Sequence, residues 1–236
     1  VCCLLLLIAC FRDPRSALYR GRRRAAWILL LAGLIVMTGL LYRQVRTAHG
    51  QPLVASRNFY GILRVFRHVG IRPEQAFLEL RHGRVAHGLQ FLTPARRRWP
   101  TAYYSPVGGV GRTLTNFERV GGRRVGLVGL GIGTLTAYGR TNDYFRCYEI
   151  NPAVLDYAGK YFSFMRDSPA RIEVVLGDAR LALERETPQQ FDILALDAFN
   201  SDAVPAHLLT VEAFALYLSH LKADGVIAVH ITNLNL

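Results

Sequence analysis

A glycine-rich turn is the first feature of this sequence that could position a ligand. Gly129, Gly131 and Gly133 form a G-L-G-I-G run directly after the apolar stretch 125–128. Glycines allow a sharp turn and a close approach of the backbone to a ligand, and the helix after such a turn directs its N-terminus at that ligand. The pattern is typical of the opening of a nucleotide-binding α/β unit.

Three carboxylates follow the turn, each at the end of an apolar segment: Glu149, Asp178 and Asp197. Glu149 lies about where such folds place an acid on ribose hydroxyls. The turn Asp178-Ala179 suits an adenine amino group, from which a carboxylate can accept a hydrogen bond. Each acid alone could simply cap the helix after it. Three in succession favour a ligand site at one sheet edge, of the adenosylmethionine type rather than the dinucleotide type.

The elements that must position these residues alternate regularly along the chain. The pattern predicts helices at 132–140, 152–162, 179–186 and 208–222, and strands at 124–129, 144–150, 172–177, 191–197 and 225–231. Crossovers of this length imply parallel neighbouring strands. The expected fold class is therefore α/β, a class I methyltransferase-like (Rossmann-like) doubly wound sheet.

The segment ahead of this sheet has a different pattern. Short apolar runs over 57–95, with a hairpin turn at His82-Gly83, predict a small antiparallel β module. Residues 96–118 are expected to be a loop-rich connection, and the second glycine cluster within them a flexible loop. We divide the chain into membrane segments and linker (1–56, the linker at 43–58), β module and loop (57–118), and catalytic domain (119–236). Folds of this class continue with a further helix and two strands, so we expect a fragment truncated at its C-terminus.

Two apolar segments near the start predict attachment to a membrane. Residues 1–10 resemble the end of one membrane helix, and residues 25–42 are 18 residues without a charge, with Trp27 and Tyr42 near the ends. That length can span a bilayer, and aromatic residues are typical of its interfaces. A buried core helix is the alternative. The arginine-rich loop 11–24 does not decide the orientation, and we expect an integral protein of the plasma or inner membrane with a cytoplasmic catalytic domain.

The net charge of +12 is unevenly distributed, which argues against a nucleic-acid partner. Residues 125–236 carry 8 basic and 13 acidic side chains, whereas residues 1–124 carry 21 and 4. A nucleic-acid-binding domain needs a basic face, and the domain that holds the three carboxylates is acidic, as suits a cationic substrate. The four cysteines and the histidines show no metal-ligand or disulfide spacing, so no metal is expected.

With these motifs in view, residues 57–236 resemble the polyamine aminopropyltransferases, the spermidine synthases, and most of all their membrane-attached branch fused to transporter-like transmembrane helices. The resemblance depends on the β module ahead of the sheet and on four motifs: the glycine turn, Tyr-Glu-Ile-Asn at 148–151, Gly-Asp-Ala at 177–179 and Asp-Ile-Leu-Ala-Leu-Asp at 192–197. It depends above all on the segment 197–214. It implies transfer of an aminopropyl group from decarboxylated S-adenosylmethionine to a di- or polyamine such as putrescine, with release of methylthioadenosine. It also suggests a homodimer.

The resemblance assigns roles to the acids. Asp197 would be the general base, because an alkylamine is protonated near neutral pH and must lose a proton before it attacks. Glu149 would bind the ribose hydroxyls, and Asp178 with Ala179 the adenine. The glycine turn would lie against the cosubstrate.

On the amine side the sequence departs from the family pattern. Tyr103 falls at a substrate-contacting tyrosine of the family, although it could instead be a packing aromatic. Gln90 falls near a family glutamine, although it could instead be a solvated strand residue. The family element Tyr-His-Glu or Tyr-Gln-Glu is replaced by Tyr103-Tyr104-Ser, and the family's second acid by Asn200, with Asp202 nearby. We expect Gln90, Tyr104, Asn200 and Asp202 to contact the amine, whose identity can differ from putrescine.

Two other functions stay open. A class I methyltransferase that uses S-adenosylmethionine itself would share the sheet and Glu149. The acidic segment after Asp197 argues against it, because methyltransferases for amide nitrogens often carry an Asn-Pro-Pro turn there. A non-catalytic membrane protein that senses polyamines or nucleosides would account for the altered amine side.

Overall fold

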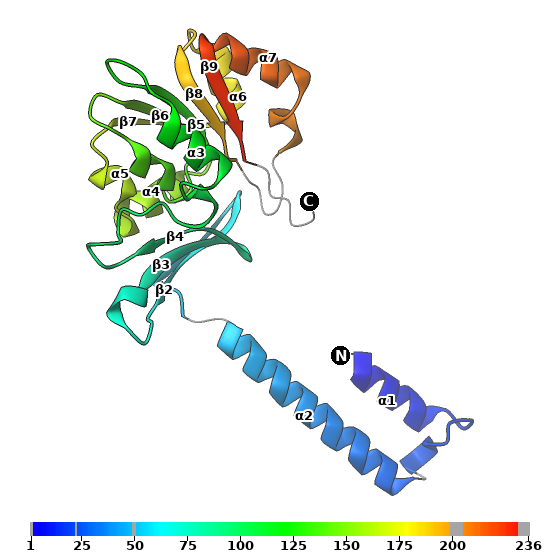
Figure 1. Cartoon of the computed structure of the whole chain (residues 1–236). Helices are drawn as coiled ribbons and strands as arrows, with labels where there is room; N and C mark the ends of the chain where they lie inside the picture. Colours follow the sequence, from blue (N-terminus) through cyan, green and yellow to red (C-terminus); the bar gives the residue numbers. More distant parts are fainter. Residues whose placement is uncertain (1, 22, 49–50, 199–204, 231–236) are drawn as a thin grey trace. The chain divides into compact units, whose positions relative to one another are not determined.

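The computed structural model describes residues 2–21, 23–48, 51–198 and 205–230. Asn200 and Asp202 lie outside the described residues. The chain forms two compact units, Val1–Gln51 and Pro52–Leu236. Figure 1 labels most of their helices and strands.

The first unit is a pair of helices. α1 (Cys2–Arg12) and α2 (Arg24–Ala48) are joined through a 3₁₀ turn, η1 (Tyr19–Gly21). Within the described residues, one stretch, Arg24–Arg43, is long and apolar enough to cross a membrane. That is weak evidence, because a signal sequence or the core helix of a soluble protein can have the same composition. The predicted polar linker at 43–58 is wrong, because α2 continues to Ala48 and a strand already begins at Val54.

The second unit opens with the predicted antiparallel module, which is confirmed. Its four strands pair in chain order: β1 (Val54–Asn58), β2 (Gly61–His68), β3 (Phe77–His82) and β4 (Val85–Phe91). A 3₁₀ turn, η2 (Pro73–Gln75), joins β2 to β3. Gly83 turns the β3–β4 hairpin with a φ of +61°, in the left-handed region that glycine tolerates. Leu63 and Val65 alternate toward the interior and join the same core as the α/β sheet, so the module packs on that sheet.

The connection to the sheet contains a helix that the sequence pattern did not predict. η3 (Ala102–Tyr104) is followed by α3 (Gly109–Asn116), so the second glycine cluster begins a helix and the expected flexible loop is wrong. A Cβ on Gly108 would lie 2.3 Å from the Tyr103 carbonyl oxygen, and one on Gly111 would lie 2.1 Å from that of Ser105. These glycines are therefore needed for the close packing of α3 against the segment that carries the two tyrosines.

The remaining strands form one parallel sheet in the order β7-β6-β5-β8-β9. Its members are β5 (Arg124–Val128), β6 (Tyr144–Glu149), β7 (Arg171–Leu176), β8 (Phe191–Leu196) and β9 (Leu221–Val229). Neighbouring residues face opposite sides, so Leu127 belongs to one core, with residues of α3 and α4, and Val128 to a second, with residues of α6 and α7. The predicted α/β class with a doubly wound sheet is confirmed, and the strand order reverses at β5, where such sheets bind ligands.

The crossover helices differ in detail from those predicted. They are α4 (Pro152–Tyr161), the short α5 (Phe164–Asp167), α6 (Ala179–Arg185) and α7 (Val211–Ser219), with η5 (Ala206–Leu208) before α7. The predicted helix 132–140 is instead a 3₁₀ turn, η4 (Thr134–Tyr138), bounded by Gly133 and Gly139. The helix predicted at 208–222 is shorter, because Leu221 already pairs with Phe191 in the sheet.

Candidate active site

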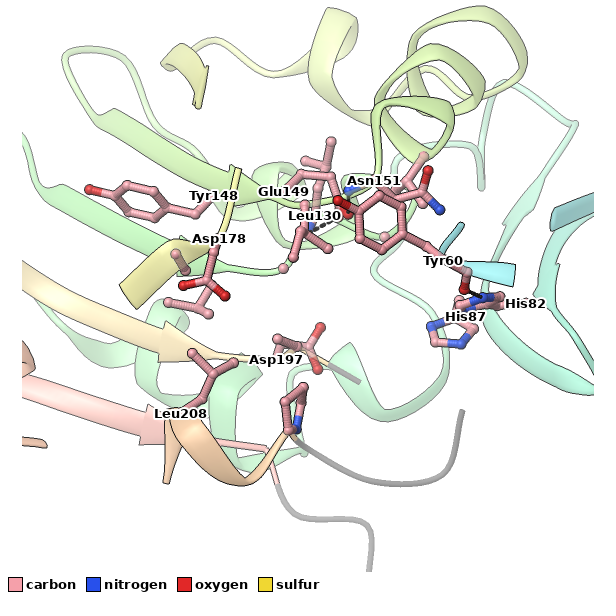
Figure 2. A pocket seen from close by; sticks show the side chains of 18 of the residues that line it. Tyr60, His82, His87, Leu130, Tyr148, Glu149, Asn151, Asp178, Asp197 and Leu208 are labelled. Atoms are coloured by element: carbon pink, nitrogen blue, oxygen red, sulfur yellow. Dashed lines mark hydrogen bonds between the residues drawn. The ribbon is translucent and has the colours of Figure 1, made fainter. Parts of the chain in front are cut away.

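A cavity of about 330 Å³ lies at the carboxyl ends of the parallel strands, near the lower end of the range for small-molecule sites. It is lined by the glycine turn, by the ends of β6 and β8, by the first turn of α6, and by residues of the β module. Figure 2 shows Glu149, Asp178 and Asp197 around this one cavity, together with Tyr60 and His87 of the module. The β module therefore supplies one wall of the site.

The glycine turn forms part of the floor of the cavity. Gly129, Gly131 and Gly133 all have positive φ, at +97°, +54° and +81°. A Cβ on Gly129 would lie 2.5 Å from the Asp197 carbonyl oxygen, so only glycine lets the ends of β5 and β8 come this close. Gly129 and Gly131 line the cavity, whereas Gly133 lies at the start of η4 and is absent from the lining residues.

Glu149 is held by backbone donors alone among the contacts that the structure describes. One carboxylate oxygen accepts from the Leu130 N–H at 3.1 Å and the other from the Asn151 N–H at 2.8 Å. Burial raises the pKa of Glu149, and these backbone hydrogen bonds act against that rise. Each oxygen retains a lone pair, so the carboxylate can still accept from hydroxyl groups in the cavity.

Asp178 both lines the cavity and caps a helix. Its Oδ1 accepts from the Leu181 N–H at 3.0 Å at the start of α6, and its Oδ2 lies 2.9 Å from Nε2 of His207. Asp178 therefore caps α6 and lines the cavity as well. Glu149 caps no helix, because Asn151 caps α4. Ala179 follows Asp178 in the wall of the cavity.

Asp197 faces the cavity (Figure 2), and its side chain is only 5% exposed. The Tyr104 hydroxyl donates to its Oδ2, and Nδ1 of His230 lies 2.6 Å from its Oδ1. Burial raises the pKa of Asp197, although the hydrogen bonds from His230 and Tyr104 lower it. A carboxylate whose pKa is raised in a cavity is suited to accept a proton.

The two tyrosines form the wall beside Asp197. Their hydroxyl oxygens lie 3.3 Å apart, and the Tyr138 hydroxyl fixes the backbone by donating to the Tyr104 carbonyl at 2.6 Å. Burial raises the pKa of Tyr103 to about 12 and that of Tyr104 well above its ordinary value. Both phenols are therefore protonated at neutral pH and act as hydrogen-bond donors.

The structure places Gln90 away from the cavity, which corrects its expected contact with the amine. Its side-chain carbonyl accepts from the Ser163 N–H at 2.9 Å, and its amide donates to the Arg97 carbonyl and the Ser163 hydroxyl, both at 2.9 Å. It is only 4% exposed, so it is not a solvated strand residue either. All of its hydrogen-bonding groups are used to join β4 to the start of α5.

Several lining residues were missed because they lie in other segments of the chain. Tyr60, His82 and His87 come from the β module, and Asn151 begins α4. His230 follows the last strand and contacts Asp197 from behind the cavity wall. One signal was available: His230 ends an apolar segment in the same way as the three acids.

The fold and site together define a Rossmann-like domain of the methyltransferase class preceded by an antiparallel module. No known family model matches the chain. The chain is 32% identical over 109 residues to the polyamine aminopropyltransferase of Vibrio vulnificus, which covers 44% of this chain and 36% of the relative. It is 35% identical over 112 residues to the N-terminal histidine N-methyltransferase of Emericella nidulans, covering 44% of this chain and 19% of the relative. The chain thus spans well under half the length of the curated relatives it matches.

Two solved structures extend the likeness over more of the chain. A probable spermidine synthase from Corynebacterium glutamicum superposes with a TM-score of 0.59 at 17% identity, covering 75% of this chain and 62% of that one. The spermidine synthase of Thermotoga maritima gives 0.51 at 16% identity, covering 75% and 55%. A match over three-quarters of the chain exceeds what the parallel sheet domain alone could supply, so the shared fold includes part of the segment ahead of it.

Proposed function

We propose that this protein transfers an aminopropyl group from decarboxylated S-adenosylmethionine to a di- or polyamine and releases methylthioadenosine. The observation that carries the proposal is Asp197, whose side chain is only 5% exposed and faces a cavity that Glu149 and Asp178 also line. Similarity to polyamine aminopropyltransferases over 44% of the chain supports it. So does the antiparallel module, which the matching spermidine synthase folds share at least in part.

The proposed chemistry is a displacement at the carbon beside a sulfonium. The amine nitrogen forms the new C–N bond, the C–S bond breaks, and its electron pair stays on sulfur. The amine is cationic in water at neutral pH, so Asp197 would first hold the cation and then accept its proton. In this proposal Glu149 binds the ribose, Asp178 and Ala179 face the adenine, and Tyr103 and Tyr104 orient the amine. Holding both reactants in line supplies much of the rate.

A binding and turnover experiment tests this proposal. The full chain is titrated with decarboxylated S-adenosylmethionine, S-adenosylmethionine and methylthioadenosine, and then incubated with a panel of di- and polyamines. Preferential binding of the decarboxylated compound and release of methylthioadenosine are expected. Absence of methylthioadenosine with every amine in the panel would refute the proposal.

The alternative is a methyltransferase that uses S-adenosylmethionine itself. The imidazoles of His82 and His87 lie 5.5 Å apart, centroid to centroid, in the cavity wall. Imidazoles suit the carboxylate that S-adenosylmethionine has and its decarboxylated form lacks. The similarity to an N-terminal histidine N-methyltransferase is compatible with it. Tighter binding of S-adenosylmethionine, with methyl but no aminopropyl transfer, would favour this function.

Asn151 is a further proposed ligand contact, beside Glu149 (Figure 2). It is 3% exposed. Its Oδ1 accepts from the Ala153 N–H at 3.1 Å and from Asn58 at 2.7 Å, which fixes the orientation of the amide. Its Nδ2 has no hydrogen-bond partner among the described residues. A buried donor without a partner is costly, so we propose that it donates to an oxygen of the bound nucleoside.

Replacing Asn151 by Ser tests this contact. Serine also caps helices, so α4 keeps its cap and the thermal midpoint is expected to change little. Methylthioadenosine binding is expected to weaken roughly tenfold, as for a lost hydrogen bond to a buried group. Calorimetric titration of the variant measures it. Asn58→Ala is the control: it releases the Asn151 oxygen and the Tyr60 N–H but leaves Asn151 Nδ2 in place. Unchanged affinity in Asn151→Ser would contradict the contact.

We also propose that the first unit attaches the chain to a membrane. The support is one apolar helix, Arg24–Arg43. The full chain is expected to stay in the membrane pellet after an alkaline carbonate wash. Ile35→Arg, which places a charge within the span at a cost of about 2.5–3.5 kcal/mol, is expected to release it. Release of the unchanged chain would contradict the proposal. The homodimer stays a prediction from the resemblance, and the cytoplasmic side of the catalytic domain stays a prediction from the expected nucleotide-like cosubstrate.

A further inference from the structure

His230 reaches Asp197 through the register of the sheet. β8 and β9 are parallel neighbours in which Leu196 pairs with Val229. Asp197 directly follows Leu196, and His230 directly follows Val229. The His230 N–H donates to the Leu196 carbonyl at 2.9 Å. The backbone of the sheet therefore sets the two side chains beside each other at the edge where the cavity opens.

The imidazole contacts both Asp197 and Tyr103. Its Nδ1 lies 2.6 Å from Asp197 Oδ1, and its ring stacks on Tyr103 with centroids 4.1 Å apart and an interplanar angle of 29°. The His230 side chain is 12% exposed and the Asp197 side chain 5%. His230 is not among the residues that line the cavity, so its influence on a ligand passes through the residues that it contacts, Asp197 and Tyr103 among them.

The groups around Asp197 show why the contact with His230 affects the ionisation of this carboxylate. The titratable groups that face it are Tyr103 and Tyr104 from η3 and His230 from the end of β9, while Glu149 from β6 lines the same cavity. Within the described residues, His230 is the one side chain in contact with Asp197 that can carry a positive charge. Burial opposes ionisation of Asp197, so the hydrogen bonds to its two oxygens decide how much of it is ionised.

We propose that His230 is a positioning residue that keeps Asp197 ionised and oriented by donating its Nδ1–H to Oδ1. An ionised carboxylate only accepts hydrogen bonds, so Nδ1 must carry the proton, as in other carboxylate–histidine pairs. With Tyr104 donating to Oδ2, the two donors fix the plane of the carboxylate. The proton of the attacking amine then goes to Asp197, and His230 keeps its own. The role of His230 in turnover rests on the proposed function, but the ionisation of Asp197 can be measured without any substrate.

The experiment compares His230→Asn with His230→Leu in the full chain. Asparagine keeps an amide N–H near the place of Nδ1, whereas leucine removes the donor. The carboxyl signal of Asp197, assigned by its loss in Asp197→Asn, is followed against pH by ¹³C NMR of protein labelled at aspartate. Relative to the unchanged chain, His230→Leu is expected to shift the titration upward by at least one pH unit, about 1.4 kcal/mol, and His230→Asn by less than half of that.

The acid limb of the pH profile of kcat should also shift to higher pH, and by more in His230→Leu than in His230→Asn. His68→Leu removes a similar contact, 2.7 Å from Glu79 and outside the cavity wall, and should leave the Asp197 signal unchanged. An unmoved titration in a folded His230→Leu variant, or equal shifts in both His230 variants, would overturn the assignment. Absence of aminopropyl transfer in the unchanged chain would instead refute the proposed function and leave the carboxyl titration to test His230 by itself.

Discussion

Replacing Asp197 by Asn is expected to reduce aminopropyl transfer by about 10²–10⁴-fold, the range for loss of a general base. Asparagine has nearly the same shape and can still accept from Tyr104, but it cannot take a proton from the amine. Binding of methylthioadenosine should change much less, because in the proposal the nucleoside is held by Glu149 and Asp178 at other walls of the cavity. Rates from methylthioadenosine release and affinities from titration separate the two effects.

The same substitution should leave the protein at least as stable near neutral pH. Because burial raises the pKa of Asp197 above its ordinary value, the folded state binds this proton more tightly than the unfolded chain. The contribution of Asp197 to the free energy of unfolding is therefore full below the ordinary pKa and is lost as the pH rises through the raised one. Asparagine never ionises, so its advantage over Asp197 should be greatest above the raised pKa and should vanish in acid.

Thermal unfolding of both proteins across the pH range measures this difference. Asp156→Asn is the matched control, since Asp156 forms an exposed ion pair with Lys160 on α4 and lies outside the cavity wall. It should leave turnover unchanged. A strongly destabilised Asp197→Asn near neutral pH, or one that retains full turnover, would mean that Asp197 is a structural acid and that another group accepts the proton.

The edge of the sheet could be predicted from the sequence because it depends on local patterns. Apolar segments of strand length followed by an acid, joined by helical segments, require parallel strands, and parallel strands bring their carboxyl ends together. Glu149, Asp178 and Asp197 therefore had to meet at one edge, and the structure places all three in the lining of one cavity. The glycine turn could be predicted in the same way, because a sharp turn that approaches a ligand closely requires glycine.

The wall beside Asp197 could be predicted only in part, because it depends on contacts between distant segments. Tyr104 reaches Asp197 across 93 residues, and Gln90 reaches Ser163 across 73, and no local pattern records either contact. The second glycine cluster was misjudged for a similar reason. Its glycines are required by the neighbouring backbone of Tyr103 and Ser105, whose approach is visible only once α3 is packed. Sequence patterns describe elements, whereas packing between them decides which side chains face the ligand.

Replacing Arg123 by Met is expected to cost about 3–5 kcal/mol of the free energy of unfolding, as when one partner of a buried ion pair is removed. Arg123 is 1% exposed and Asp143 3%. The guanidinium lies 2.5 Å from Asp143 and donates to the Tyr138 carbonyl at 2.8 Å and to the carbonyl of Leu114. Methionine fills the space but leaves a buried carboxylate without its cation. Since domains are typically stable by only about 5–15 kcal/mol, the loss should lower the urea midpoint strongly.

The pH dependence gives a second test of the pair. Burial opposes ionisation of Asp143, but hydrogen bonds from the Arg123 side chain and from the Arg123 and Arg140 backbone outweigh it and hold the pKa of Asp143 below its ordinary value. This stabilisation is present above the ordinary pKa and is lost as the pH falls through the lowered one. The unchanged chain should therefore lose stability in acid, and the difference from Arg123→Met should narrow there.

Two further variants separate the ion pair from simple packing. Arg140→Met removes an exposed pair with Glu118, where a loss of under about 1 kcal/mol is typical. The double variant Arg123→Met with Asp143→Asn removes both charges, so its loss should be smaller than the sum of the single losses by more than about 1 kcal/mol. Additive losses would show that the two side chains act independently. They would also argue against a joint role of Arg123 and Asp143 in holding α3 and η4 to the first two strands of the parallel sheet.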